Sequence, residues 1–120
     1  NINLMLTGGN TAKNLYLYFS KNFYFLNKFF NIYITDERFS SSRSKINNGF
    51  MIEKKFINNI KINNFYFYKY DSNSKNVKRT CDNYSKKIKK KIDILILSIG
   101  KGGHIASIFD ENFKLLRTNR

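Results

Sequence analysis

The only histidine of the chain, His104, follows a glycine-rich stretch that contains Gly100, Gly102 and Gly103. Histidine can exchange a proton near neutral pH without a large pKa shift, so His104 is a candidate general base or acid. The glycines let the backbone turn sharply and expose its N–H groups, which predicts an anion-binding nest. A lone histidine is more often a surface or packing residue. Its position after a candidate parallel strand favours a functional role, because ligands bind at that edge of α/β sheets.

A second glycine-containing turn comprises Gly8, Gly9, Asn10 and Thr11, directly before a candidate helix for which Thr11 is the expected N-cap. Glycine permits close approach of the backbone to a ligand, and a helix N-terminus offers free N–H groups and a positive dipole end. Phosphate is the ligand that suits such a turn. A tight turn without any ligand explains the same residues equally well.

The third chemically unusual stretch is Asp36, Glu37 and Arg38, at the end of another strand candidate. Its carboxylates could position a substrate or act as a base, and the Arg38 guanidinium could bind phosphate through two parallel hydrogen bonds. The common alternative for such a triplet is a solvated cluster of surface ion pairs.

Several other kinds of site are excluded by their missing patterns. The chain has no P-loop, no Gly-x-Gly-x-x-Gly dinucleotide pattern and no Gly-x-Ser-x-Gly nucleophile elbow. One histidine and one cysteine cannot form a Cys/His cluster, which argues against a zinc site. We therefore expect no metal.

The elements that must position these loops alternate along the chain. Strands are expected over residues 2–6, 31–35, 64–69 and 92–97, and helices over 12–20, 47–59 and 77–88. The last helix has an apolar stripe of Val77, Cys81, Tyr84 and Ile88. Residues 94–97 are an unbroken apolar run, typical of a strand covered on both faces, and a further helix should start after the turn at His104. Residues 22–30 are ambiguous between the end of a helix and a connection.

This alternation predicts a Rossmann-like α/β domain over residues 1–120, with a parallel sheet built of right-handed βαβ units. In such a sheet, the turns that follow the first, second and last strands lie at one edge. The three unusual loops can therefore converge on one site.

The amino-acid composition limits the classes of protein to which the chain can belong. The 120 residues are 42% hydrophobic, enough for a core, and no apolar run reaches the length of a membrane span. No signal peptide is expected, and the single Cys81 fits a reducing compartment, so we expect a cytoplasmic protein. The net charge of +14 suggests nucleic acid, and the lysines of residues 86–91 support that alternative. The abundance of Asn, Lys and Ile with no Pro instead indicates a genome-wide bias that spreads charge without marking a binding face.

The three loops together resemble those of the 6-phosphogluconolactonase family, within the superfamily that includes glucosamine-6-phosphate deaminase. Residues 6–16 are similar to the family's Ser-Gly-Gly-Ser-Thr-Pro segment and its helix, 35–39 to its Asp-Glu-Arg motif, and 47–49 to its Asn-Tyr-Gly. Residues 98–109 are similar to its Gly-Met-Gly-x-Asp-Gly-His-Thr-Ala-Ser-Leu-Phe. Arg38 favours the lactonase branch, because the deaminases usually carry Tyr there.

The resemblance implies a small-molecule sugar-phosphate substrate and hydrolysis of 6-phosphogluconolactone to 6-phosphogluconate in the oxidative pentose phosphate pathway. His104 would activate the attacking water, and Asp36 would orient or assist the histidine side of the site. Arg38 would anchor the phosphate together with the first loop, and the N–H groups near Gly102 and Gly103 would stabilise the oxyanion. The route needs no cofactor.

The chain also departs from the family pattern. Gly102 stands where the family has Asp, Ile46 stands where it has Ser, and family members are considerably longer. These differences keep three alternatives open: a truncated or degenerate relative that binds sugar phosphate without catalysis, a deaminase-like isomerase, and a basic nucleic-acid-binding module. The sequence does not indicate an oligomeric state.

Overall fold

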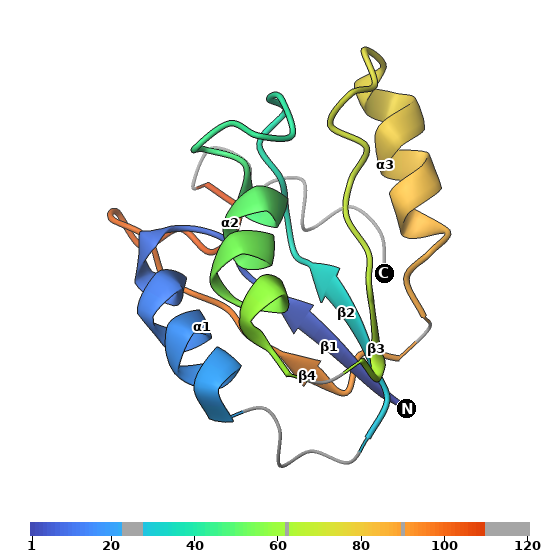
Figure 1. The fold of residues 1–120 in the computed structure, drawn as a ribbon. Coiled ribbons are helices and arrows are strands. Elements are labelled where there is room, and N and C mark those ends of the chain that lie inside the picture. Colours follow the sequence, from blue (N-terminus) through green and yellow to red (C-terminus); the bar gives the residue numbers. More distant parts are fainter. Residues whose placement is uncertain (23–27, 62, 90, 110–120) are drawn as a thin grey trace.

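The computed structural model describes residues 1–22, 28–61, 63–89 and 91–109 of the chain. They form a four-stranded parallel sheet with the order β3-β2-β1-β4 and flanking helices (Figure 1). In chain order the elements are β1 (Ile2–Leu6), α1 (Asn10–Asn22), β2 (Phe30–Ile34), α2 (Asn48–Lys55), the 3-10 turn η2 (Ile57–Asn59), β3 (Phe65–Phe67), α3 (Val77–Ser85) and β4 (Ile94–Leu95). The predicted α/β fold is confirmed. None of the described helices is long and apolar enough to cross a membrane.

The predicted elements before His104 are present with shifted ends. Helix α1 begins at Asn10, so Thr11 lies inside its first turn and is not the N-cap. The helix expected over residues 47–59 divides into α2 and η2, because Phe56 leaves helical geometry with φ −121° and ψ −68°. The ambiguous segment 22–30 falls partly on residues 23–27, which lie outside the described residues.

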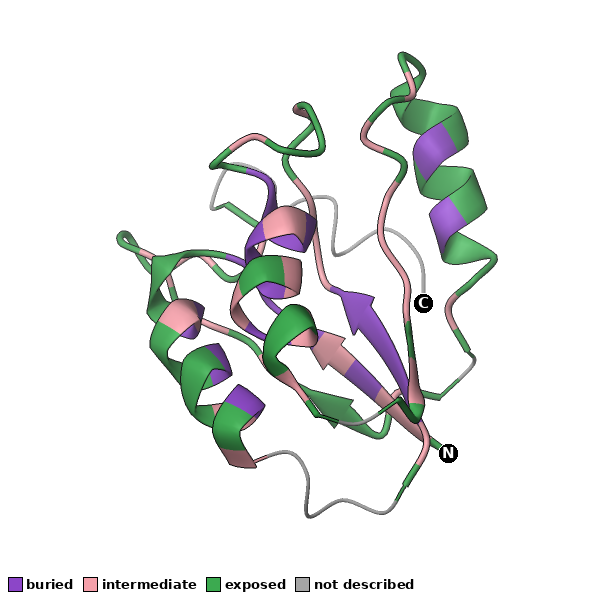
Figure 2. Cartoon of the chain, viewed as in Figure 1, coloured by how far each residue is buried: buried purple, intermediate pink, exposed green. Residues whose placement is uncertain are grey.

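The core lies between the sheet and the helices α1 and α2. All five residues of β2 are buried, as Figure 2 shows for this strand. Ile32 and Ile34 belong to the same apolar cluster as Tyr16 of α1 and Ile52 of α2. The Tyr16 ring also stacks on Phe56, with centroids 6.1 Å apart. This packing fixes the two helices over the two central strands.

Helix α3 stands apart from α1 and α2 and is joined to β2 through a tyrosine (Figure 1). The Tyr84 hydroxyl accepts a hydrogen bond from the Ile34 N–H at 2.7 Å and donates one to the Ile34 carbonyl at 2.8 Å. Burial raises the pKa of Tyr84. The predicted apolar stripe was partly wrong, since Val77 and Cys81 are exposed. The buried residues of α3 are Thr80 and Tyr84, one helical turn apart, because the Tyr84 hydrogen bonds set the rotation of the helix.

Strand β4 differs from its prediction. It is two residues long, and Ile94 and Leu95 are 46% and 52% exposed, so the expectation of a strand buried on both faces was wrong. The reason is its position at the edge of the described sheet, where β1 is its one partner among the residues that the structure describes. Asp93 ties its start to Asn3, whose N–H donates to the carboxylate at 2.9 Å. That hydrogen bond lowers the pKa of Asp93.

The helix expected after His104 is absent from the described residues, which end at Phe109. Residues 104–109 form turns, with isolated antiparallel bridges between Ile105 and both Ile99 and Ile108. Ala106 has a φ of 51°, a left-handed conformation that a right-handed helix cannot include.

Candidate active site

The three loops singled out in the sequence meet in one cavity of about 210 Å³ at the carboxyl ends of β1, β2 and β4. Its lining comprises Thr7, Gly8, Gly9, Asn10 and Thr11 from the first loop, Asp36 and Arg38 from the second, Ser98, Gly100, His104 and Ala106 from the third, and Asn48. The cavity lies where a parallel sheet is expected to bind its ligand. Gly102 and Gly103 are outside this lining.

The first loop depends on two glycines for different reasons. Gly9 has a φ of 88°, which favours glycine. Gly8 is needed because a side chain occupies the space where its Cβ would be: that atom would lie 2.0 Å from Cγ of Asn48. The loop is also anchored to helix α1, since the Tyr16 hydroxyl donates a hydrogen bond to the Thr7 carbonyl.

Asn48 joins the first loop to the second. It is buried, with 8% of its surface exposed, and its Nδ2 donates to the Asp36 carbonyl at 2.9 Å. Sequence reasoning did not place Asn48 in the site. The available signal was its place in the Asn-Asn-Gly motif, but that motif does not show that the side chain fills the space above Gly8.

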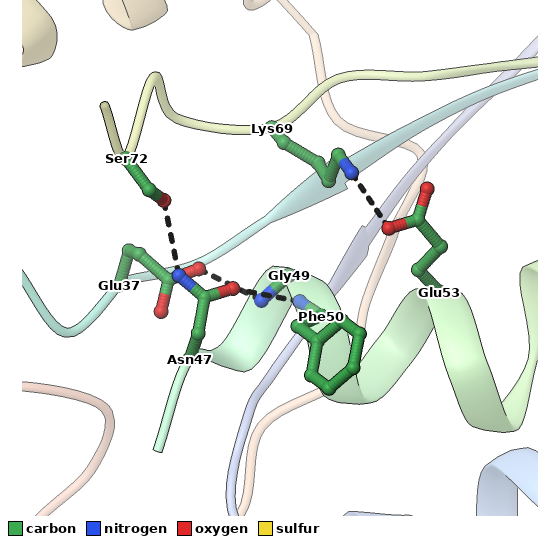
Figure 3. A network of polar contacts seen from close by, with 7 residues as sticks. All are labelled: Glu37, Asn47, Gly49, Phe50, Glu53, Lys69 and Ser72. Carbon is green, nitrogen blue, oxygen red and sulfur yellow. Dashed lines mark hydrogen bonds and ion pairs between the residues drawn. The ribbon is translucent and has the colours of Figure 1, made fainter. Parts of the chain in front are cut away.

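Glu37 has a structural role and does not line the cavity. Its carboxylate accepts a hydrogen bond from the Asn48 N–H at 2.6 Å. It accepts another from the Gly49 N–H at 2.7 Å, which Figure 3 shows. Negative charge at a helix N-terminus is stabilising, so Glu37 holds the loop after β2 against the start of α2. Asn47 completes this cap, with its Oδ1 accepting from the Phe50 N–H and its Nδ2 donating to Ser72 (Figure 3).

Asp36 reaches the third loop through a serine. Its carboxylate accepts hydrogen bonds from the Ser107 hydroxyl at 2.6 Å and the Thr35 hydroxyl at 2.8 Å. Among the described residues, no hydrogen bond joins this carboxylate to the His104 ring. The expected assistance of Asp36 to His104 is therefore indirect in this structure: Asp36 holds the backbone segment that follows the histidine.

The His104 ring is held so that one nitrogen can act as a base. Its Nδ1 lies 3.1 Å from the Ala106 carbonyl oxygen. A carbonyl oxygen can only accept, so in the neutral imidazole Nδ1 carries the proton and Nε2 keeps its lone pair. The ring stacks on Phe109 with centroids 4.6 Å apart. Its Nε2 lies over Gly100, where an added Cβ would be only 2.1 Å away. Gly100 therefore provides the space for the ring.

The glycine turn has the backbone conformation expected of it. Gly102 and Gly103 have φ values of 86° and 82°. The Gly103 N–H already donates to the Gly100 carbonyl at 3.1 Å, and the Gly100 N–H donates to the His104 carbonyl at 2.9 Å. These bonds stabilise the turn and occupy one of the two N–H groups predicted to receive an oxyanion. Gly102 is the remaining candidate donor.

Tyr70 lies behind the second loop and stacks on Tyr84, with ring centroids 3.8 Å apart. Burial, followed by the nearby Cys81, Asp36 and Glu37, raises the pKa of Tyr70 to about 12, so its hydroxyl stays neutral at physiological pH.

Within the described part of the chain, no three His, Cys, Asp or Glu side chains gather where they could hold a metal ion.

Comparisons with known proteins agree with this arrangement. A family model described as "Glucosamine-6-phosphate isomerases/6-phosphogluconolactonase" matches residues 1–120. Among solved structures, the 6-phosphogluconolactonase from Thermotoga maritima shares 27% sequence identity with this chain, and its crystal structure superposes with a TM-score of 0.76. The match covers 92% of this chain and 51% of that chain. No curated protein sequence is a significant match.

Two more distant structures share the fold. The 6-phosphogluconolactonase from Trypanosoma cruzi is 23% identical with a TM-score of 0.71, over 92% of this chain and 51% of that chain. The 6-phosphogluconolactonase from Trypanosoma brucei is 21% identical in sequence with a TM-score of 0.69, and the match covers 90% of this chain and 51% of that chain. The chain thus spans about half the length of the structures it matches. Because the family model matches the sequence from end to end, the chain belongs to the glucosamine-6-phosphate isomerase/6-phosphogluconolactonase family.

Proposed function

We propose that the chain carries the active-site half of a 6-phosphogluconolactonase and hydrolyses 6-phosphogluconolactone to 6-phosphogluconate. The observation that carries the proposal is the single cavity shared by the His104 ring, Arg38 and the start of α1. It combines a proton acceptor with groups that bind phosphate. The similarity to lactonases of known structure supports the same substrate class.

In this proposal the phosphate binds at Gly8, Gly9, Asn10 and Thr11, with the Arg38 guanidinium as a second anchor. Anchoring the phosphate makes attack at the lactone carbonyl effectively intramolecular. Nε2 of His104 takes a proton from water while the water oxygen bonds to the carbonyl carbon, and the Gly102 N–H is the proposed donor to the oxyanion. The tetrahedral intermediate then releases the ring oxygen, which takes the proton back from His104. These steps consume one water and yield the open acid.

Asp36 acts in this scheme as a positioning residue. Its bond to Ser107 holds the segment whose Ala106 carbonyl sets the His104 tautomer. The lone Cys81 supports a cytoplasmic location, and the substrate would place the reaction in the oxidative pentose phosphate pathway. We propose that residues 1–120 act as one domain, because all three loops arise from one sheet.

A second candidate is sugar-phosphate binding without hydrolysis. The observation that favours it is the Gly103 N–H, which is already bonded to Gly100 and so unavailable to an oxyanion in this conformation. Gly102 also stands where the family carries a carboxylate, which removes one possible partner for the histidine.

The deciding experiment is a coupled assay on 6-phosphogluconolactone, corrected for spontaneous hydrolysis, with the wild type, His104→Ala and His104→Gln. Loss of a general base should reduce kcat by about 10²–10⁴-fold. Lys21→Gln, at the far end of α1, is the matched control and should keep wild-type activity. Binding of 6-phosphogluconate by a folded but inactive wild type would favour the second candidate. Activity that survives in both His104 variants would overturn the proposed mechanism.

A further inference from the structure

A second cavity of about 300 Å³ adjoins the first and shares Gly9, Asn10, Arg38 and Asn48 with it. We call it the basic hollow, defined by Lys13, Arg38 and Lys45, which all line it. The rest of its lining is Ile46, Asn47 and Met51, so no acidic side chain of the described residues contributes to the hollow.

The three cations come from different elements and converge. Lys13 is on the first turn of α1, Arg38 follows β2, and Lys45 lies in the loop before α2. None of them forms an ion pair within the described part of the chain, where the three pairs are Lys69–Glu53, Lys78–Asp82 and Lys91–Asp93. Positive charge is therefore concentrated and left unneutralised at the place where the α1 dipole adds to it.

Asn48 separates the hollow from the cavity that contains His104. It lines both, is almost fully buried, and is fixed by its bond to the Asp36 carbonyl. A ligand anchored at Gly9 and Asn10 could thus contact the lysines on one side and extend toward His104 on the other. This layout suits a molecule with a dianionic end and a neutral polyhydroxy body.

We infer that Lys13 and Lys45 form the cationic wall of the phosphate subsite and determine the preference for phosphorylated over unphosphorylated sugars. The inference rests on the proposed function only for the identity of the sugar acid. The prediction that the lysines bind a phosphate group does not depend on that function. Lys45 lies outside the segments that carry the family resemblance, and Lys13 lies in the helical part of the first segment, after the residues expected to hold phosphate. Their contribution follows from the hollow alone.

The test measures the dissociation constants of 6-phosphogluconate, inorganic phosphate and unphosphorylated gluconate by calorimetry at low salt. The variants are Lys13→Gln, Lys45→Gln and the double variant, with Lys21→Gln as the control on the same helix. We expect each single change to weaken binding of both phosphate ligands by roughly five-fold, as for an exposed ion pair, and the double change by roughly twenty-fold. Gluconate binding and the control should change less than about two-fold.

A kinetic readout separates this inference from the proposed function. If the chain is a lactonase, the lysine variants should raise KM for 6-phosphogluconolactone, with kcat and the turnover of unphosphorylated gluconolactone unchanged. Lysine-dependent phosphate binding by a chain that hydrolyses nothing would retain the inference and reject the function. Phosphate binding that is absent from the wild type, or unchanged in the double variant, would overturn the inference whether or not the lactone is hydrolysed.

Discussion

Strands β2 and β4 belong to the same parallel sheet and both deliver a loop to the cavity, yet their surroundings are opposite. Every residue of β2 is buried, whereas both residues of β4 are exposed. The loop after β2 is tied to α2 through Glu37 and Asn48. The loop after β4 is held mainly by its own backbone bonds and by Ser107.

The contrast shows that the site has one half set by the core and one half set by local turns. The groups proposed to bind phosphate lie in the half that core packing fixes, while the proposed proton acceptor, His104, lies in the half set by local turns. Two matched pairs of residues, Gly8 with Gly100 and Tyr84 with Asp93, allow the contrast to be tested. In each pair, the first residue is buried beside the core and the second lies near β4.

The largest effect is expected for Gly8→Ala. The new Cβ would lie 2.0 Å from the buried Asn48 side chain, which cannot move without breaking its bond to Asp36. Overpacking of this kind should lower the free energy of unfolding by about 3 kcal/mol, measured by chemical denaturation. The double variant Gly8→Ala/Asn48→Ala should recover part of that loss. A double variant no more stable than Gly8→Ala would show that Asn48 is not the obstacle.

Tyr84→Phe should have the next largest effect. Removing the hydroxyl leaves the buried Ile34 N–H without its acceptor, which should cost about 2 kcal/mol. The pH dependence gives a second readout. The folded state holds the Tyr84 proton above its ordinary pKa of 10.0, so the contribution of Tyr84 to stability is constant below pH 10 and falls as the pH rises beyond it. Denaturation curves between pH 8 and 11 should show a shallower alkaline fall in the variant; an equally steep fall would assign it to other groups, such as Tyr16 and Tyr70.

Gly100→Ala makes the same kind of clash as Gly8→Ala but near β4. Its Cβ would lie 2.1 Å from Nε2 of the half-buried His104, a ring that can rotate away. The loss of stability should therefore stay below about 1 kcal/mol, while the imidazole resonances shift and the proposed lactonase activity falls. A loss as large as that of Gly8→Ala would contradict the idea that the two halves of the site differ in rigidity.

Asp93→Asn should have the smallest effect, because the contact with Asn3 is exposed. The Asn3 N–H lowers the pKa of Asp93 below its ordinary value of 3.8. Its stabilising contribution is present above pH 3.8 and is lost as the pH falls through the lowered pKa. Thermal unfolding should show a small difference between variant and wild type at pH 7 that vanishes at low pH. A difference that persists in acid would point to a cause other than the charge.

The order of elements and the convergence of the three loops could be predicted from the sequence. Alternating strand and helix patterns place the turns after β1, β2 and β4 at one edge, and the structure brings Asp36, Arg38 and His104 into one cavity there. Strand β2 was also predicted to within one residue, because Ile32, Tyr33 and Ile34 favour a strand and polar residues follow from Thr35 to Arg38.

The rest depended on contacts that periodicity does not encode. An apolar run such as residues 94–97 indicates a strand but not whether that strand lies at the edge of a sheet. The conformation of Ala106, which prevents a helix, reflects the local turn. The roles of Asn48 and Ser107 arise from partners far away in the sequence, Gly8 and Asp36.

Within the described residues, β4 lies at an edge of the sheet with exposed apolar side chains, and this has a practical consequence for handling the protein. Unpaired backbone groups and exposed apolar side chains at a sheet edge favour strand pairing between molecules. At low ionic strength, the net charge of +14 keeps the copies apart by mutual repulsion. Added salt shortens the range of that repulsion to about 10 Å at 0.1 M. We therefore expect colloidal stability to decrease with ionic strength, the reverse of ordinary salting-in, so purification and binding measurements belong in dilute buffer.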